Sequence, residues 1–159
     1  QSIEELVEVG RSSGVAAFNI IPDRNYTTGQ SDQKLENLNQ VIQLTKDLGL
    51  PLLGGTEMNS PGQKFVDDFA SPELAPHQAV FLLGSWILHA HSTLQRYAGM
   101  GYLSEWANNQ FPDISAKNEF YASFGESFSP RGDDRLKDSL NAEMGATEVR
   151  DLMTKVMSV

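Results

Sequence analysis

The segment Leu50–Gln63, LPLLGGTEMNSPGQ, decides how this sequence is interpreted. It begins with a short apolar stretch, Leu50–Gly55, and then places polar side chains, among them Glu57 and Asn59, before a proline. A buried strand that ends in polar side chains is how α/β proteins commonly present a ligand site at the carboxyl edge of a sheet. We therefore predict a strand over residues 50–55, followed by a loop that faces a ligand.

A similar pattern lies upstream. Gly14–Ile21, GVAAFNII, is a continuous apolar run of the kind found in strands that are covered on both faces. Asp23, Arg24 and Asn25 follow this run after a proline. Between the two runs, Gln33–Leu48 repeats its apolar residues with the 3.6-residue period of a helix. The pattern predicts a β–helix–β unit with parallel strands and a right-handed crossover.

A parallel arrangement predicts which polar residues meet. Both strands would finish on the same side of the sheet, which would bring Asp23, Arg24 and Asn25 close to Glu57 and Asn59. Glu57 is the candidate catalytic residue, because a carboxylate at a strand end can act as a general acid or base. The other four are candidate substrate-binding residues, and Arg24 could hold an anionic group through two hydrogen bonds.

Each of these residues also has a plain structural interpretation. Glu57 could be a capping or turn residue near a helix over residues 61–69, because carboxylates favour helix N-termini. Asp23, Arg24 and Asn25 could form only a turn that an Asp–Arg pair holds. The sequence leaves both pairs of interpretations open.

The rest of the chain is predicted to be mainly helical. Before the first strand, Ser2 and Glu5 form a capping box for a helix. One face of this helix carries Ile3, Leu6, Val7 and Val9. After the second strand we predict a short helix over Gln63–Phe69 and a long one over Pro76–Gly99, which is apolar almost all round and therefore buried. The aromatic residues at helical spacing are interpreted as core: Trp86, Trp106, Phe120, Tyr121 and Phe124.

The predicted fold class is α/β, as a partial (β/α) barrel fragment. One parallel βαβ unit, residues 1–73, is followed by a helical C-terminal region, residues 74–159, packed on it. Two parallel strands do not make a stable sheet, because three or more are normally needed. We therefore expect further strands from a missing N-terminal portion, or from a second copy that forms a homo-oligomer through exposed strand edges.

The composition excludes several classes of function. The formal charge of −9 argues against binding to nucleic acid, for which a basic surface would be expected. The chain has no cysteine, which rules out disulfides, thiolate zinc sites and cysteine nucleophiles. The most apolar run, Ala79–Ala90, is shorter than the roughly 20 residues that span a bilayer. No membrane partner and a cytoplasmic location are expected.

A pair of histidines, His89 and His91 in WILHAHSTL, is the most specific motif. It resembles the Leu-His-x-His signature of the PHP (polymerase and histidinol phosphatase) metal hydrolases, where a strand end presents both histidines to a metal. In a helix, residues two apart point about 200° apart and cannot share a metal. Three interpretations stand: coincidence, which we favour, a histidine hydrogen-bonded in the core, or a metal pair at a strand end.

Three longer segments carry a family resemblance: FNIIPDRN (residues 18–25), LGLPLLGGTEMNSPGQKFVDDF (48–69) and LQRYAGMGYLSEWA (94–107). Over about Gly14–Gly125 the chain resembles the C-terminal part of bacterial PHP-domain, metal-dependent hydrolase-like TIM barrels. The resemblance implies that the two strands are late barrel strands. It also implies that the ligands of a divalent metal lie upstream of Gln1, and it assigns no metal ligand in this chain.

The function that the resemblance implies is part of a phosphoesterase-like hydrolase acting on a small phosphorylated or carbohydrate-like molecule. A metal-bound hydroxide would attack, and Glu57 would orient or protonate the substrate. This portion alone is expected to be inactive. Two alternatives remain: a non-catalytic helical assembly module built on residues 76–99, or a sugar-phosphate isomerase barrel that needs a proton-shuttling base.

Overall fold

The structure, a computed structural model, describes residues 2–22, 32–59, 61–62, 65–127 and 134–157. Its contacts divide the chain into two compact units, Gln1–Leu83 and Gly84–Val159. The described residues are mostly helical and contain one two-stranded parallel sheet. The predicted combination of a βαβ unit with a mainly helical C-terminal region is therefore confirmed, while a barrel remains a prediction.

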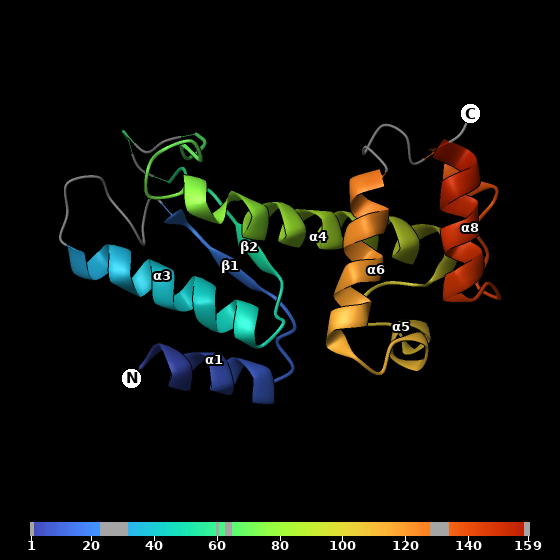
Figure 1. Cartoon of the computed structure of the whole chain (residues 1–159), viewed down its shortest axis with the longest axis horizontal. Coiled ribbons are helices and arrows are strands. Elements are labelled where there is room, and N and C mark those ends of the chain that lie inside the picture. Colours follow the sequence, from blue (N-terminus) through green and yellow to red (C-terminus); the bar gives the residue numbers. More distant parts are fainter. Residues whose placement is uncertain (1, 23–31, 60, 63–64, 128–133, 158–159) are drawn as a thin grey trace. The chain divides into compact units, whose positions relative to one another are not determined.

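The elements follow the predicted order (Figure 1). The first unit contains α1 (Ile3–Ser12), β1 (Phe18–Ile20), α3 (Asp32–Asp47), β2 (Leu52–Gly54), the 3-10 helix η1 (Ala75–His77) and the start of α4. Helix α4 (Gln78–Ala98) continues into the second unit, which also contains α5 (Glu105–Gln110), α6 (Ile114–Ser127), α7 (Asp134–Lys137) and α8 (Ala146–Met157).

Strands β1 and β2 pair in parallel, with α3 as the connection between them (Figure 1). Phe18 lies opposite Leu52, and Ile20 lies opposite Gly54. Gly49 ends α3 in the left-handed conformation, with φ of 65°. The N–H of the next residue then donates to the carbonyl of Thr45 at 2.8 Å, which is the Schellman motif. This turn leads directly into β2 and fixes where the strand begins.

One face of the strand pair supplies the core of the first unit. Side chains of this cluster come from both strands, α3, α4 and the segment before η1: Ile20, Leu38, Ile42, Leu52, Leu74 and Phe81. The prediction that the first strand is covered on both faces is wrong. Val15, Ala17 and Asn19 are exposed, whereas Phe18 and Ile20 turn inward. The helices described in this unit bury one face only, so the alternation of a half-buried strand appears.

The capping box predicted for α1 is confirmed, since the Ser2 and Glu5 side chains each bond the other's backbone N–H. The predicted apolar face is only partly buried. Val7 lies in the core, whereas Leu6 is 59% and Val9 is 56% exposed. Successive helix residues are rotated by about 100°, which places Leu6 and Val9 on the flank of the apolar face that is farther from Val7. This flank is left uncovered in the described structure.

Two further expectations need correction. Phe65–Phe69, the described part of the helix predicted over residues 63–69, is not helical. The long helix exists as α4, but the prediction that it is wholly buried is wrong, because Leu82, Leu83 and Leu88 are exposed. Within the described ranges, no helix combines the length and the apolar character needed to cross a membrane.

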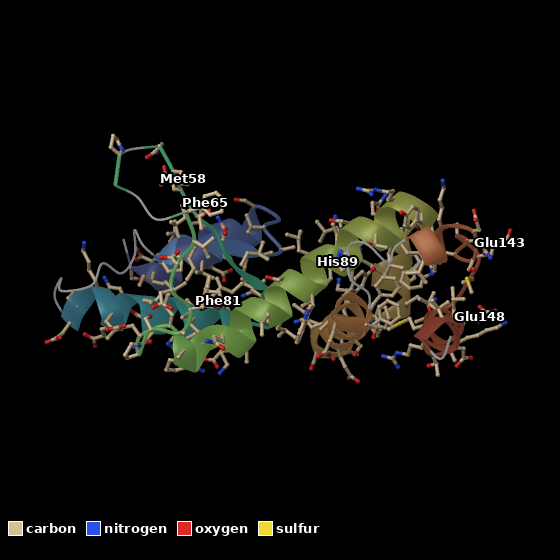
Figure 2. The ribbon with its side chains drawn as sticks, turned by 90° about the horizontal axis from the view of Figure 1, so that it is seen from above. Met58, Phe65, Phe81, His89, Glu143 and Glu148 are labelled. Carbon is tan, nitrogen blue, oxygen red and sulfur yellow. The ribbon has the colours of Figure 1, made fainter. Side chains whose placement is uncertain are left out.

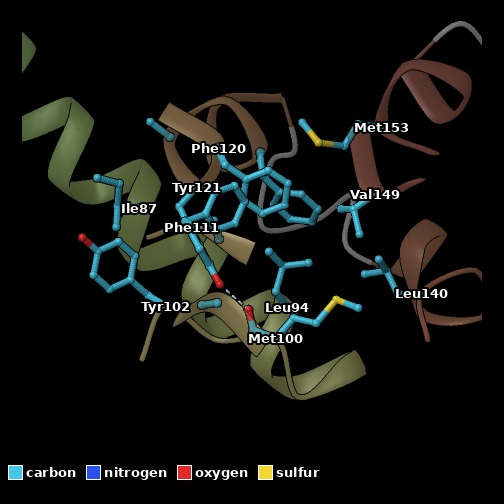
Figure 3. Packing of buried hydrophobic residues seen from close by; sticks show 14 of the residues in the cluster. Ile87, Leu94, Met100, Tyr102, Phe111, Phe120, Tyr121, Leu140, Val149 and Met153 are labelled. Carbon is cyan, nitrogen blue, oxygen red and sulfur yellow. Dashed lines mark hydrogen bonds between the residues drawn. The ribbon is translucent and has the colours of Figure 1, made fainter. Parts of the chain in front are cut away.

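The second unit is built around a compact aromatic core (Figure 3). Phe120, Tyr121 and Phe124 on α6 are almost fully buried, as the sequence predicted. The rings of Phe111 and Phe120 lie 4.8 Å apart, and the Tyr102 and Tyr121 rings meet edge to face at 5.1 Å. Leu94 from α4 and Val149 from α8 complete the same cluster.

Helices α4 and α6 are in close contact at Gly125. A Cβ built on this glycine would fall on the carbonyl oxygen of Trp86 and only 2.7 Å from its Cα. Backbone atoms of α4 cannot rotate away as a side chain can, so the contact requires a residue without a side chain. Gly125 therefore sets the distance between the two helices.

We predict that Gly125→Ala lowers the free energy of unfolding of the second unit by about 2 kcal/mol or more, because the added methyl forces α6 off α4. Urea denaturation followed by tryptophan fluorescence measures this, since Trp86 lies at the contact. The matched control is Gly145→Ala, where the nearest atom is 3.6 Å away. Equal stability of the two variants would contradict the assigned contact.

Candidate functional site

The candidate site lies at the carboxyl edge of β1 and β2. The last paired residues are Ile20 and Gly54, and the N–H of Gly55 donates to the Ile20 carbonyl at 2.7 Å. This bond extends the ladder by one residue, so the chain leaves both strands at the same edge. Asp23, Arg24 and Asn25 lie outside the described residues, and their approach to Glu57 remains a prediction.

Glu57 follows β2 by three residues and is partly buried. The side-chain amide of Asn59, an exposed residue, donates a hydrogen bond to Oε1 of Glu57. The structure thus brings two of the five candidate residues into contact. The described part of residues 61–69 contains no helix, so Glu57 caps none there. The capping interpretation therefore loses its support, whereas the contact between residues two apart also agrees with the interpretation of Glu57 as a turn residue.

The Glu57–Asn59 contact has a clear chemical consequence. An amide donor can hold one carboxylate oxygen in place and so fix the orientation of the whole group. A positioned carboxylate can accept a proton or a hydrogen bond from a hydroxyl, and its acid form can return a proton. The geometry therefore suits recognition of hydroxyl groups and proton transfer.

Asp67 is a further acidic residue in the same segment, and the sequence analysis missed it. It is 6% exposed, and it is the one charged residue that the described structure buries. Its backbone carbonyl accepts a hydrogen bond from the N–H of Phe69 at 3.1 Å, and the Phe69 ring packs against Phe81. The burial depends on this turn, and no sequence pattern predicts it.

Apolar side chains also flank the edge. Met58 is exposed directly after Glu57, and Phe65 is 74% exposed farther along the same segment. Figure 2 labels both side chains on the segment that follows β2. Both side chains therefore add apolar surface to the segment that carries Glu57.

The histidine pair does not form a strand-end metal site. His89 and His91 lie within α4, so they point to different sides of the helix. Nδ1 of His91 accepts a hydrogen bond from the backbone N–H of Tyr102 at 2.9 Å, which is the second of the three interpretations. His91 thus holds the chain where it turns back after α4.

Two buried tyrosines of the second unit each donate a hydrogen bond from the side-chain hydroxyl. The Tyr121 hydroxyl donates to the Met100 carbonyl and the Tyr102 hydroxyl donates to Oδ1 of Asn118, both at 2.6 Å. The first of these bonds is drawn in Figure 3. Burial raises the pKa of Tyr102 to about 12. Burial lowers the pKa of Lys117, whose ammonium lies 4.7 Å from the Tyr102 ring centre.

These contacts predict a loss of stability at high pH. In the unfolded chain a tyrosine releases its proton near pH 10, whereas folded Tyr102 keeps it up to about pH 12. The stabilisation is fully present below pH 10 and is lost as the pH rises to 12, and it amounts to about 3 kcal/mol at most. Tyr102→Phe should flatten this decline, measured as the free energy of unfolding in urea at pH 9 and 12. Identical declines in both proteins would contradict the prediction.

Comparison with known proteins gives no relative. The chain matches no family model, no curated protein and no solved structure. The resemblance to PHP-domain hydrolases therefore stays a prediction, and the function has to be argued from the strand edge itself.

Proposed function

We propose that this chain forms one wall of the ligand site of a metal-dependent, phosphoesterase-like hydrolase. A small phosphorylated or carbohydrate-like substrate would lie at the carboxyl edge of β1 and β2, against Glu57. The observation that carries the proposal is the parallel pairing, with Ile20 opposite Gly54, because ligands of α/β proteins bind outside the carboxyl ends of parallel strands.

Glu57 is the proposed proton-transfer group. Its carboxylate is partly buried at the strand edge, and the Asn59 amide holds Oε1. In this orientation it would orient the substrate or, in its acid form, protonate the leaving oxygen. The same carboxylate would hydrogen-bond the substrate before reaction.

Among the described residues, no group of three His, Asp or Glu side chains lies close enough together to hold a metal ion. The proposal therefore assigns no metal ligand to them. Their contribution is limited to binding, orientation and proton transfer.

We predict that Glu57→Gln weakens the binding of glucose 6-phosphate, the probe for a phosphorylated carbohydrate, by about tenfold. The reason is the loss of a charge-assisted hydrogen bond, which contributes about 1.5 kcal/mol or more. Titration followed by ¹H–¹⁵N NMR measures the affinity and locates the site, with shifts expected at the amides of Gly54, Gly55 and Glu57.

The control is Glu36→Gln, an exposed carboxylate on α3 in the same unit, which should bind like the native chain. Shifts confined to another part of the chain would overturn the proposed site. Equal affinities of Glu57→Gln and the native chain would remove Glu57 from it.

A second candidate function is self-assembly through the first unit. Leu6 and Val9 expose the uncovered half of the α1 apolar face, and the two-stranded sheet has fewer strands than a stable sheet normally needs. Pairing of β1 with β1 of a second copy would extend the sheet, and we propose that the exposed apolar faces of the two α1 helices pack in the same interface. An isologous dimer of this kind is the simplest closed assembly.

This second candidate predicts a dimer that Leu6→Glu dissociates, because a charge would be buried in the interface. Light scattering after size exclusion should give twice the chain mass for the native protein at high concentration. Leu103→Glu, at an exposed leucine of the second unit, should leave the dimer intact. A native chain that is monomeric at all concentrations would contradict self-assembly.

A further inference from the structure

Asn19 is a polar residue in the middle of β1, flanked by core residues. It lies opposite Leu53 in the ladder, and its neighbours Phe18 and Ile20 both pack into the first unit's core. Successive strand residues point to opposite faces, so Asn19 lies on the face that the described helices leave open. Its side chain is exposed there. Asparagine is depleted in strands, so its presence here suggests a role beyond strand formation.

The Asn19 amide lies across the sheet, over the backbone of Gly55. A Cβ on Gly55 would be 2.7 Å from both Nδ2 and Oδ1 of Asn19, so the amide occupies the space that a side chain would fill. Gly55 is itself held by its hydrogen bond to Ile20. The pair therefore forms a defined polar surface at the carboxyl edge.

This surface is next to the proposed proton-transfer group. Gly55 and Glu57 are two residues apart, a distance of about 7 Å for an extended chain. A single small molecule can therefore reach the Asn19 amide and the Glu57 carboxylate together. Neither the first strand's apolar pattern nor its predicted two-sided burial indicated that Asn19 belongs to the site.

We propose that Asn19, placed by Gly55, binds the hydroxyl groups of a carbohydrate-like substrate at this edge. The inference rests on the proposed function and specifies which part of the substrate lies there. An amide offers two N–H donors and a carbonyl acceptor, which matches a hydroxyl that both donates and accepts. The neighbouring carboxylate also accepts from hydroxyls, whereas it repels phosphate. The phosphate would therefore lie away from Asn19.

The test uses two variants that act on the same contact. Asn19→Ala removes the amide. Gly55→Ala keeps Asn19, but its new methyl displaces the amide, which can rotate away without disturbing the backbone. Each should weaken binding of glucose 6-phosphate about fivefold, the effect of losing one neutral hydrogen bond. The double variant should bind no more weakly than either single variant, because the two substitutions remove the same interaction.

Asn37→Ala, at an exposed asparagine of α3, is the matched control and should bind normally. Thermal unfolding checks that all variants remain folded. In NMR titrations of the native chain, the Asn19 side-chain NH₂ signals should shift with glucose and with glucose 6-phosphate, and should stay in place with inorganic phosphate.

Three results would decide the matter. Native affinity in Asn19→Ala, or equal NH₂ shifts with inorganic phosphate, would overturn the inference and leave the role of Glu57 standing. A loss in Asn19→Ala with native affinity in Glu57→Gln would support Asn19 and remove Glu57 as the partner group. No binding of either sugar would overturn both proposals.

Discussion

The parallel pairing of β1 and β2 is the constraint on which the functional argument depends. The connection through α3 returns the chain to the same end of the sheet, so that Gly55 can bond to Ile20 at the place where both strands finish. Because of this parallel geometry, Glu57 and Asn19 lie at the same edge of the sheet. In an antiparallel pair the chain would leave the strands at opposite ends, and no common site would form.

Much of the local structure could be predicted from the sequence, because it depends on residues close to one another. The Ser2–Glu5 capping box and the glycine that ends α3 are examples. Which faces are buried could not be predicted, because burial depends on layers that distant residues supply. The exposure of Leu6, Val9 and Asn19 shows this directly. Of the candidate site, Glu57 and Asn59 could be proposed from their position after a strand, whereas Asn19 lies in an apolar run that did not suggest it.

The second unit follows a different principle of construction. Its polar groups are buried with partners, as in the bonds of Tyr121 to Met100 and of His91 to Tyr102, and they hold the turn after α4 against α6. The bond of His91 gives a structural role to one of the two histidines whose motif looks like a metal signature. A histidine whose ring nitrogen accepts a backbone N–H within a helical unit fixes the chain path, and it offers no paired ligand to an ion.

Gly125 has a consequence for tracing the ancestry of this chain. Since the carbonyl of Trp86 occupies the place of a side chain, any distant sequence that shares this pair of crossing helices must also have a glycine there, or else separate the helices. The requirement is set by sterics alone and is independent of overall sequence identity. A glycine at this point of the second helix, after two or three buried aromatic residues, is therefore a structural fingerprint by which unrecognised relatives can be sought.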